Sequence, residues 1–353
     1  MGATAMSNAV TAHLQKEILL DKIGEYNGIT DIEGITVGHY TDPAAASGVT
    51  VILCPTGAVA GVDVRGSAPG TRETDLLAPT NLVDQIQAVV LSGGSVFGLS
   101  AADGVVKWLS SRGYGYSLTG GAAAPIVPAA TLFDLERGYS AIPSIGPDWG
   151  ENACNAALGK QIAMGSVGAG TGALSGGIKG GIGTASLTLT SNVTVAALAA
   201  VNSFGSTIDA ETGRFWEQRA ERENEFGPQG KRNVRLPAAS VYGTGGHTTI
   251  AVVATDALLT KAQAQKIAQM AHDGMARAIR PAHTMFDGDT VFCLATGKHA
   301  VDNRSDTPGS LEAMMINYIG NAAADCLARS ILHGILSAET IGDMIAYRDL
   351  SDR

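Results

Sequence analysis

Hydrophobic and polar residues alternate along the chain with two different periods. Short apolar runs bounded by turn residues predict strands at residues 49–53, 88–91 and 289–295. Three stretches instead place apolar residues at helical spacing: residues 98–109, 260–279 and 310–335. The first of these helices carries Val105, Val106 and Leu109 on one face, and the second follows a capping threonine, Thr260. Alternating strands and helices predict a layered α/β protein.

One segment, residues 209–235, interrupts the pattern because it is polar and highly charged. It holds six charged residues between Glu217 and Glu225, followed by the turn-forming pair Gly227-Pro228. A segment this polar cannot bury enough apolar surface to offset the entropy lost on ordering. We therefore expect an exposed loop, either an ordinary surface insertion or a loose tail.

Composition agrees with a folded enzyme and excludes several classes of protein. The chain has 353 residues, 45% of them hydrophobic, which suffices for a sizeable core. Its net charge of −9 argues against a nucleic-acid partner, whose binding surface would be basic. Residues 1–26 contain no apolar run of signal-peptide or transmembrane length, so we expect a cytoplasmic protein with no membrane partner.

Two patterns that suggest a metal or cofactor fail on spacing. The cysteines lie far apart without paired ligand spacing, so buried reduced thiols are expected at Cys54, Cys154, Cys293 and Cys326. The glycine-rich tract at residues 165–186 is no phosphate loop, because Lys179 precedes Gly180 where that motif needs serine or threonine. The tract either packs backbones closely or shapes a pocket around Lys179, and we expect no cofactor and no metal.

The most informative stretch begins at Gly245, where a glycine turn leads into an apolar strand that starts with Thr248 and Thr249. A cut before Thr248 would leave a hydroxyl nucleophile and a free α-amine on one residue. Such a threonine needs no distant histidine, because its own amine accepts the hydroxyl proton. The alternative is a hairpin turn that enters a β-branched strand.

Several long motifs in one order resemble the P1 family of self-cleaving peptidases, peptidase family S58. They lie at residues 35–40, 69–75, 92–98, 179–185, 248–250 and 287–290. The resemblance covers nearly all of residues 29–349. It implies an α/β fold of the N-terminal-nucleophile type, a four-layer αββα sandwich like that of DmpA and ornithine acetyltransferase.

The resemblance also implies a function. The single domain, residues 1–353, would cleave itself between His247 and Thr248 into fragments 1–247 and 248–353, which would assemble as a homotetramer of cleaved protomers. The mature enzyme would be an aminopeptidase acting on short peptides or amino-acid amides. One alternative is a 6-aminohexanoate (nylon) oligomer hydrolase. Another, from a different class, is an unprocessed binding or assembly protein with no catalysis.

Roles for four further residues follow from the same resemblance. Asn202 would donate its amide to the tetrahedral oxygen, and Lys179 would add positive charge near the nucleophile. Asp287 and Asp289 would orient the new α-amine and the hydroxyl. Without the resemblance, Asn202 fits a turn at a strand end. The two aspartates flanking Gly288 then fit turn chemistry, and they lack the further ligands that a metal site needs.

Three residues are predicted to line the substrate pocket: Ser95, Phe97 and Phe133. Ser95 is no nucleophile elbow, because Phe97 occupies the position that requires glycine, so we expect a helix cap or a pocket-lining residue. His283 has no obvious acid partner in the sequence order that an α/β-hydrolase requires, so we expect a structural role for it. Two positions depart from the family. Phe133 replaces a tyrosine of several relatives, and His247 replaces asparagine or glycine.

Overall fold

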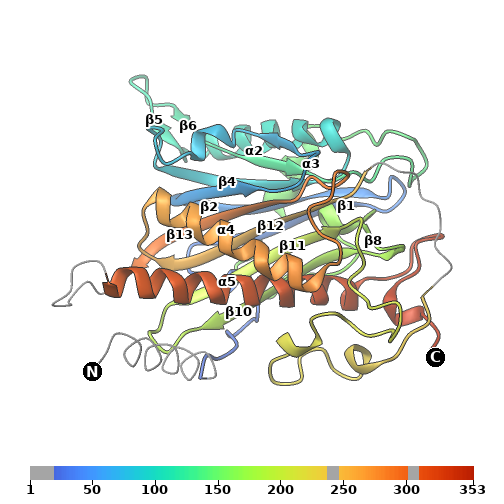
Figure 1. Ribbon diagram of the computed structural model, residues 1–353. Helices are drawn as coiled ribbons and strands as arrows, with labels where there is room; N and C mark the ends of the chain where they lie inside the picture. The colour runs from blue at the N-terminus through green and yellow to red at the C-terminus, as the bar shows by residue number, and fades with distance from the viewer. Residues whose placement is uncertain (1–19, 237–245, 301–309) are drawn as a thin grey trace, which may run out of the picture.

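The computed structural model describes residues 20–236, 246–300 and 310–353, and it alternates strands with helices (Figure 1). The helices are α2 (Ala101–Ser110), α3 (Pro147–Asn155), α4 (Lys261–Ala278) and α5 (Ser310–Ser337). The main strands are β1 (Thr36–Asp42), β2 (Ser47–Val64), β3 (Gly70–Arg72), β4 (Gln85–Ser92), β7 (Ala129–Thr131), β10 (Gly181–Thr188), β11 (Thr194–Asn202), β12 (Thr248–Ala257) and β13 (Thr290–His299). Two small hairpins pair β5 (Tyr116–Ser117) with β6 (Ala123–Ala124) and β8 (Leu174–Ser175) with β9 (Ile178–Lys179).

The nine main strands form one mixed sheet that passes through β2. Its order is β10-β11-β12-β13-β2-β4-β7-β3, with β1 also paired to β2, and the pairs β12–β13 and β4–β7 are parallel. The register of β2 on β4 shifts between Leu53 and Ala58. Beyond that shift, β2 pairs with β13 and lies under α4 at Gly61, where a Cβ would come within 2.3 Å of the Gln265 nitrogen. β2 therefore carries the chain from one half of the sheet to the other.

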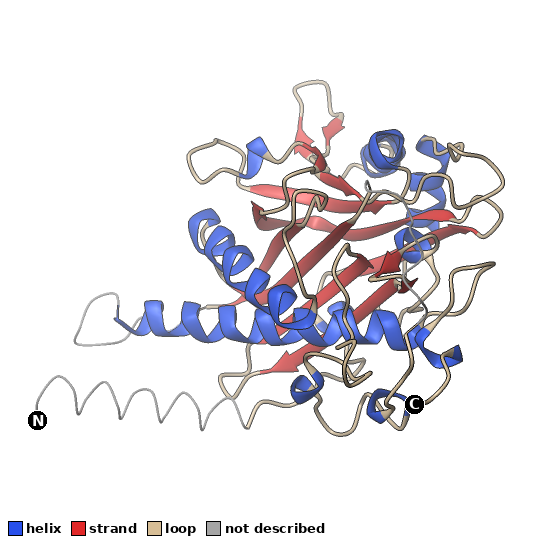
Figure 2. Cartoon of the chain, turned by 45° about the vertical axis from the view of Figure 1, so that its right-hand side comes forward, coloured by secondary structure: helices blue, strands red, loops and turns tan. Residues whose placement is uncertain are grey.

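The two halves of the sheet face each other across an inner core, because strand side chains alternate between faces. Buried residues of this core come from both halves and include Ile52, Val89, Leu198 and Val252. Their sequence neighbours point to the helices. Ala197 and Val253 pack with α4 and α5, whereas Val51 and Val90 pack with α2 and α3. Helices therefore cover both outer faces (Figure 2), which confirms the four-layer αββα prediction.

The predicted helices are confirmed with shifted ends. α4 lies one residue inside each predicted end, and its cap Thr260 accepts a hydrogen bond from the Gln263 nitrogen. α5 extends two residues beyond the prediction. α2 begins at Ala101 rather than at residue 98, because Gly94 and Ser95 take left-handed φ values of 79° and 53° and start a tight 3-10 helix instead.

The polar segment at residues 209–235 is a loop with two short 3-10 helices, as expected, but it is not a loose tail. Phe215, Phe226 and Val234 are buried in the core beside α5. Glu225 forms an ion pair with Arg329 of α5, at 2.6 Å. The segment is therefore anchored by both apolar and ionic contacts. The average polarity of its sequence does not indicate these few anchoring residues.

The four cysteines are buried and unpaired, as predicted. Within the described residues, no helix is long and apolar enough to cross a membrane. Residues 1–19, on which most of the expectation about targeting rested, and Gly245 lie outside the described part of the chain.

Candidate active site

Thr248 is the first residue of β12, and only 4% of its surface is exposed. The antiparallel register of β11 and β12 places it directly opposite Asn202, the last residue of β11. Parallel pairing with β13 on the other side brings the loop that precedes β13 to the same end of the sheet. Residues that are 46 positions apart in sequence, Asn202 and Thr248, therefore meet as cross-strand neighbours.

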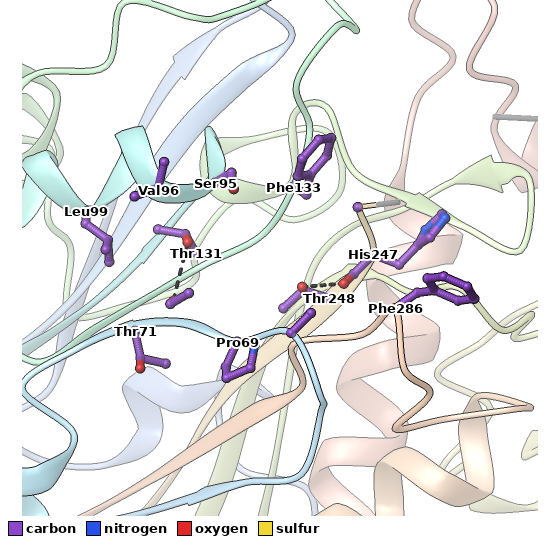
Figure 3. Close-up of a pocket in the computed structure, with 13 residues that line it drawn as sticks. Pro69, Thr71, Ser95, Val96, Leu99, Thr131, Phe133, His247, Thr248 and Phe286 are labelled. Carbon is purple, nitrogen blue, oxygen red and sulfur yellow. Dashed lines mark hydrogen bonds between the residues drawn. The ribbon is translucent and has the colours of Figure 1, made fainter. Parts of the chain in front are cut away.

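The Thr248 hydroxyl lies against the carbonyl group that precedes it (Figure 3). It donates a hydrogen bond to the His247 oxygen. The Gly288 N–H lies 3.1 Å from Thr248 Oγ1 and 3.2 Å from the His247 oxygen. One backbone donor thus reaches both the hydroxyl and the adjacent carbonyl oxygen.

The sequence does not indicate the backbone donor of Gly288. The Asp-Gly-Asp motif has two carboxylates whose chemistry is evident, whereas the glycine between them carries no side chain. The structure explains the glycine, because a Cβ there would lie 2.6 Å from the Ala68 oxygen and 2.9 Å from Thr248 Oγ1. The sequence signal for this donor is Gly288 itself, because only glycine allows the backbone to come so close to Thr248.

Asn202 is fully buried, and two donors on its amide oxygen fix the orientation of the amide. Its Oδ1 accepts hydrogen bonds from Arg137 Nη1 at 2.7 Å and from the Leu174 nitrogen at 3.0 Å. Two donors on the oxygen determine which end of the amide is the NH2 group. That group points to the oxygens of Phe133, at 3.1 Å, and Gly246, at 3.4 Å.

Asp289 and Asp287 are almost fully buried and hold the backbone around Thr248. Asp289 accepts from the nitrogens of Thr249, at 2.8 Å, and His283, at 3.0 Å. Asp287 accepts from the backbone nitrogens of two more residues, Phe204 at 3.1 Å and Thr284 at 3.0 Å. These bonds combine turn chemistry with positioning, since they fix the strand after Thr248 and the loop beside it.

Lys179 lies behind the site, and its ammonium group is turned to the backbone. Its Nζ donates to three carbonyl oxygens, those of Gly170 (2.7 Å), Ala173 (3.1 Å) and Gly180 (2.8 Å). Burial and the nearby charge of Arg137 lower the pKa of Lys179 to about 7, and Asp134 opposes them in part. Among the described hydrogen bonds, none joins Lys179 to Thr248, although the family resemblance implies positive charge beside the nucleophile.

A cavity of about 450 Å³ opens in front of Thr248. Its described lining residues carry no charged side chain: Ala68, Pro69, Gly70, Thr71, Ser95, Val96, Leu99, Thr131, Phe133, Gly246, His247, Thr248 and Phe286. The structure thus brings Ser95 and Phe133 to the wall. Phe97 is 43% exposed and is not among these residues, because the 3-10 turn presents Val96 and Leu99 instead. The cap position of this 3-10 helix is Gly94, so Ser95 is its first residue and not its cap.

His283 and His247 both contact residues around the site. His283 Nδ1 lies 2.8 Å from Asp289 Oδ2, which fits the structural role expected of it. The His247 ring meets Phe204 edge to face, with centroids 5.4 Å apart. Burial and the charge of Arg137 lower the pKa of His247, while Asp287 raises it. In the described chain, no group of three or more His, Cys, Asp or Glu residues is placed to hold a metal ion.

The fold of the chain is similar to that of solved N-terminal-nucleophile hydrolases. The solved structure of an L-aminopeptidase D-Ala-esterase/amidase from Ochrobactrum anthropi, a variant of the N-terminal-nucleophile hydrolase fold, matches with a TM-score of 0.66 at 22% identity. The match covers 94% of this chain and 92% of that one. The chain therefore has this hydrolase fold.

Sequence comparison identifies the family. The model of peptidase family S58 matches residues 27–346, so the chain belongs to this family of hydrolases. An uncharacterized aminopeptidase of Mycobacterium tuberculosis is 48% identical over 342 residues, which is 92% of this chain and 98% of the relative. A 6-aminohexanoate-oligomer endohydrolase of a Kocuria species is 30% identical over 295 residues, which is 79% of this chain and 77% of that protein.

We predict that Asp289→Asn lowers the free energy of unfolding by about 1–3 kcal/mol, because each carboxylate oxygen accepts a backbone N–H and an amide NH2 must then face one of them. Urea unfolding followed by circular dichroism measures the change. Asp103→Asn is the matched control. Its carboxylate is 52% exposed and pairs with Arg72, so it should change stability by less than about 0.5 kcal/mol. Equal effects of the two substitutions would contradict the positioning role.

Proposed function

We propose that the protein cleaves itself between His247 and Thr248 and then acts as an N-terminal-threonine amide hydrolase. The observation that carries the proposal is the contact of the Thr248 hydroxyl with the His247 carbonyl, beside the shared donor Gly288 N–H. Thr248 Oγ1 attacks the His247 carbonyl carbon, the C–N bond breaks, and the amine takes a proton. Water then hydrolyses the ester, which leaves a carboxylate on His247 and restores the hydroxyl.

In the mature enzyme, the freed α-amine of Thr248 is the general base. The hydroxyl attacks the substrate amide, the leaving amine departs with a proton, and water hydrolyses the acyl-enzyme. Negative charge on the tetrahedral oxygen requires donors that are already in place. The Asn202 amide and the Gly288 N–H supply them, because both already point to carbonyl oxygens of residues 246 and 247.

For the substrate, we propose short peptides or amino-acid amides, cleaved as an aminopeptidase does. The support is the name of the 48% identical mycobacterial relative. We further propose a homotetramer of cleaved protomers, on the family resemblance alone, and a cytoplasmic location, on the short apolar runs interrupted by charges in residues 1–26. A third possibility is an unprocessed binding or assembly protein, which the first experiment below distinguishes from an enzyme.

A second candidate activity is endohydrolysis of 6-aminohexanoate oligomers. It is favoured by the uncharged wall of the cavity among the described residues, which offers no carboxylate to a substrate ammonium. A bond inside an oligomer has uncharged groups on both sides and fits such a wall. The 30% identical relatives that carry this name agree with it.

Thr248→Ala should abolish self-cleavage and leave one chain of 36.0 kDa, since it removes the attacking oxygen. Mass spectrometry during prolonged incubation follows the chain. The matched control is Thr249→Ala, which removes a buried hydroxyl with no hydrogen-bond partner among the described residues and should cleave. A processed Thr248→Ala protein rules out the nucleophile. A wild-type chain that stays intact supports the non-catalytic alternative.

Asn202→Ala should lower kcat by roughly 10²–10³, the loss that follows removal of one oxyanion donor. KM should change much less, because the neutral carbonyl of the bound substrate depends less on this donor. Steady-state kinetics, normalised to the amount of cleaved protein, measure both constants. An unchanged kcat would return Asn202 to the role of a strand-end structural residue.

Alanine p-nitroanilide should be hydrolysed with a kcat/KM at least about tenfold above that of its N-acetyl derivative if the enzyme is an aminopeptidase. The two substrates share the scissile bond and differ in the charge of the acyl residue. Initial rates over a range of concentrations give both values. A preference for the acetylated substrate would instead favour the endohydrolase.

A further inference from the structure

We infer that Arg137 is a positioning residue for hydrolysis: together with the Leu174 nitrogen it holds the oxygen of the Asn202 amide, and its charge strengthens that amide as an oxyanion donor. This inference rests on the proposed function. It transfers to Arg137 the electrostatic role that the family resemblance implies for Lys179.

The geometry connects Arg137, through Asn202, with the backbone one residue before the proposed cleavage site. Arg137 lies in the loop that follows β7, and its Nη1 donates to Asn202 Oδ1 at 2.7 Å and to the Gly172 oxygen at 2.6 Å. On the opposite end of the same amide, Nδ2 faces the Gly246 oxygen. The guanidinium and the carbonyl region therefore lie on the two sides of one planar group.

A charged donor on the oxygen of an amide makes its N–H groups stronger donors, because hydrogen bonds in a chain polarise one another. The second donor on this oxygen, the Leu174 nitrogen, is neutral. Leu174 also keeps the Asn202 amide from flipping when Arg137 is replaced, because a flip would place the Asn202 NH2 group against the Leu174 N–H, and both are donors. Replacement of Arg137 thus removes mainly its charge and leaves the orientation of Asn202 largely in place.

The positive charge of Arg137 also reaches the residue that precedes the nucleophile. After burial, it is the largest cause that lowers the pKa of His247, and it acts in the same direction on Lys179. The ammonium of Lys179 is held by three carbonyls. Arg137, by contrast, contacts the amide of the proposed oxyanion donor directly.

A double-mutant cycle tests the inference on fully matured protein: wild type, Arg137→Gln, Asn202→Ala and the double variant. Arg137→Gln should lower kcat about tenfold with little change in KM. In the Asn202→Ala background the same substitution should have almost no further effect on kcat at a pH above the acid limb, because there Arg137 acts through Asn202. Arg112→Gln, which removes an exposed arginine stacked on Trp108, is the matched control and should leave kcat unchanged.

Two further readouts separate positioning from a structural role through the Gly172 bond. Arg137→Lys keeps the charge and should recover part of the lost kcat. The acid limb of kcat/KM should move to higher pH in Arg137→Gln, because loss of a neighbouring cation raises the pKa of the Thr248 α-amine, which must be neutral to act as base. The variant leaves the other titratable groups of the site and of the surroundings of Arg137 unchanged: Asp134, Lys179, His247, His283, Asp287 and Asp289.

The outcomes are distinct. A kcat loss that is the same in both backgrounds, or an unchanged kcat in Arg137→Gln, overturns the inference and leaves the proposed function intact. A matured wild-type protein that hydrolyses no amide overturns the proposed function, and the inference with it. If Arg137→Gln does not mature, the cycle is measured with Arg137→Lys, and additivity there overturns the inference equally.

Discussion

The register at the start of β12 is the constraint on which the site depends. β11 pairs with this strand from one side and sets Asn202 opposite Thr248. From the other side, the turn into β13 brings the Gly288 N–H to the Thr248 hydroxyl, and Asp289 holds the next backbone nitrogen, that of Thr249. A shift of one residue would turn every side chain of β12 to the opposite face and remove the hydroxyl from its donor.

The charged side chains of the site bond to backbone groups around the nucleophile. The two aspartates are committed to backbone N–H groups, and Lys179 is committed to backbone carbonyls. The cavity wall in the described residues is uncharged. Thr248 and Asn202 are buried, and oriented N–H groups in buried surroundings act more strongly than they would in water.

Local patterns predicted the elements well, because spacing and capping are local properties: both long helices and the Thr260 cap appear where the sequence indicates them. The four-layer arrangement came from the family resemblance, and pattern alone gave only a layered α/β class. The pairing of Asn202 with Thr248 depends on strand register. The three carbonyl oxygens around the Lys179 ammonium depend on the course of a glycine-rich loop. The exposure of Phe97 depends on the left-handed turn at Gly94 and Ser95. None of these is a local property.

The most direct test of the central claim is the rate at which a new Thr248 amine appears in purified wild-type protein, measured by N-terminal sequencing at several protein concentrations. We expect a second sequence that begins Thr-Thr-Ile-Ala-Val-Val, from Thr248 onward, to appear with a rate constant that does not depend on concentration. A different new terminus, a rate that rises with protein concentration, or a chain that stays intact would contradict self-cleavage by Thr248.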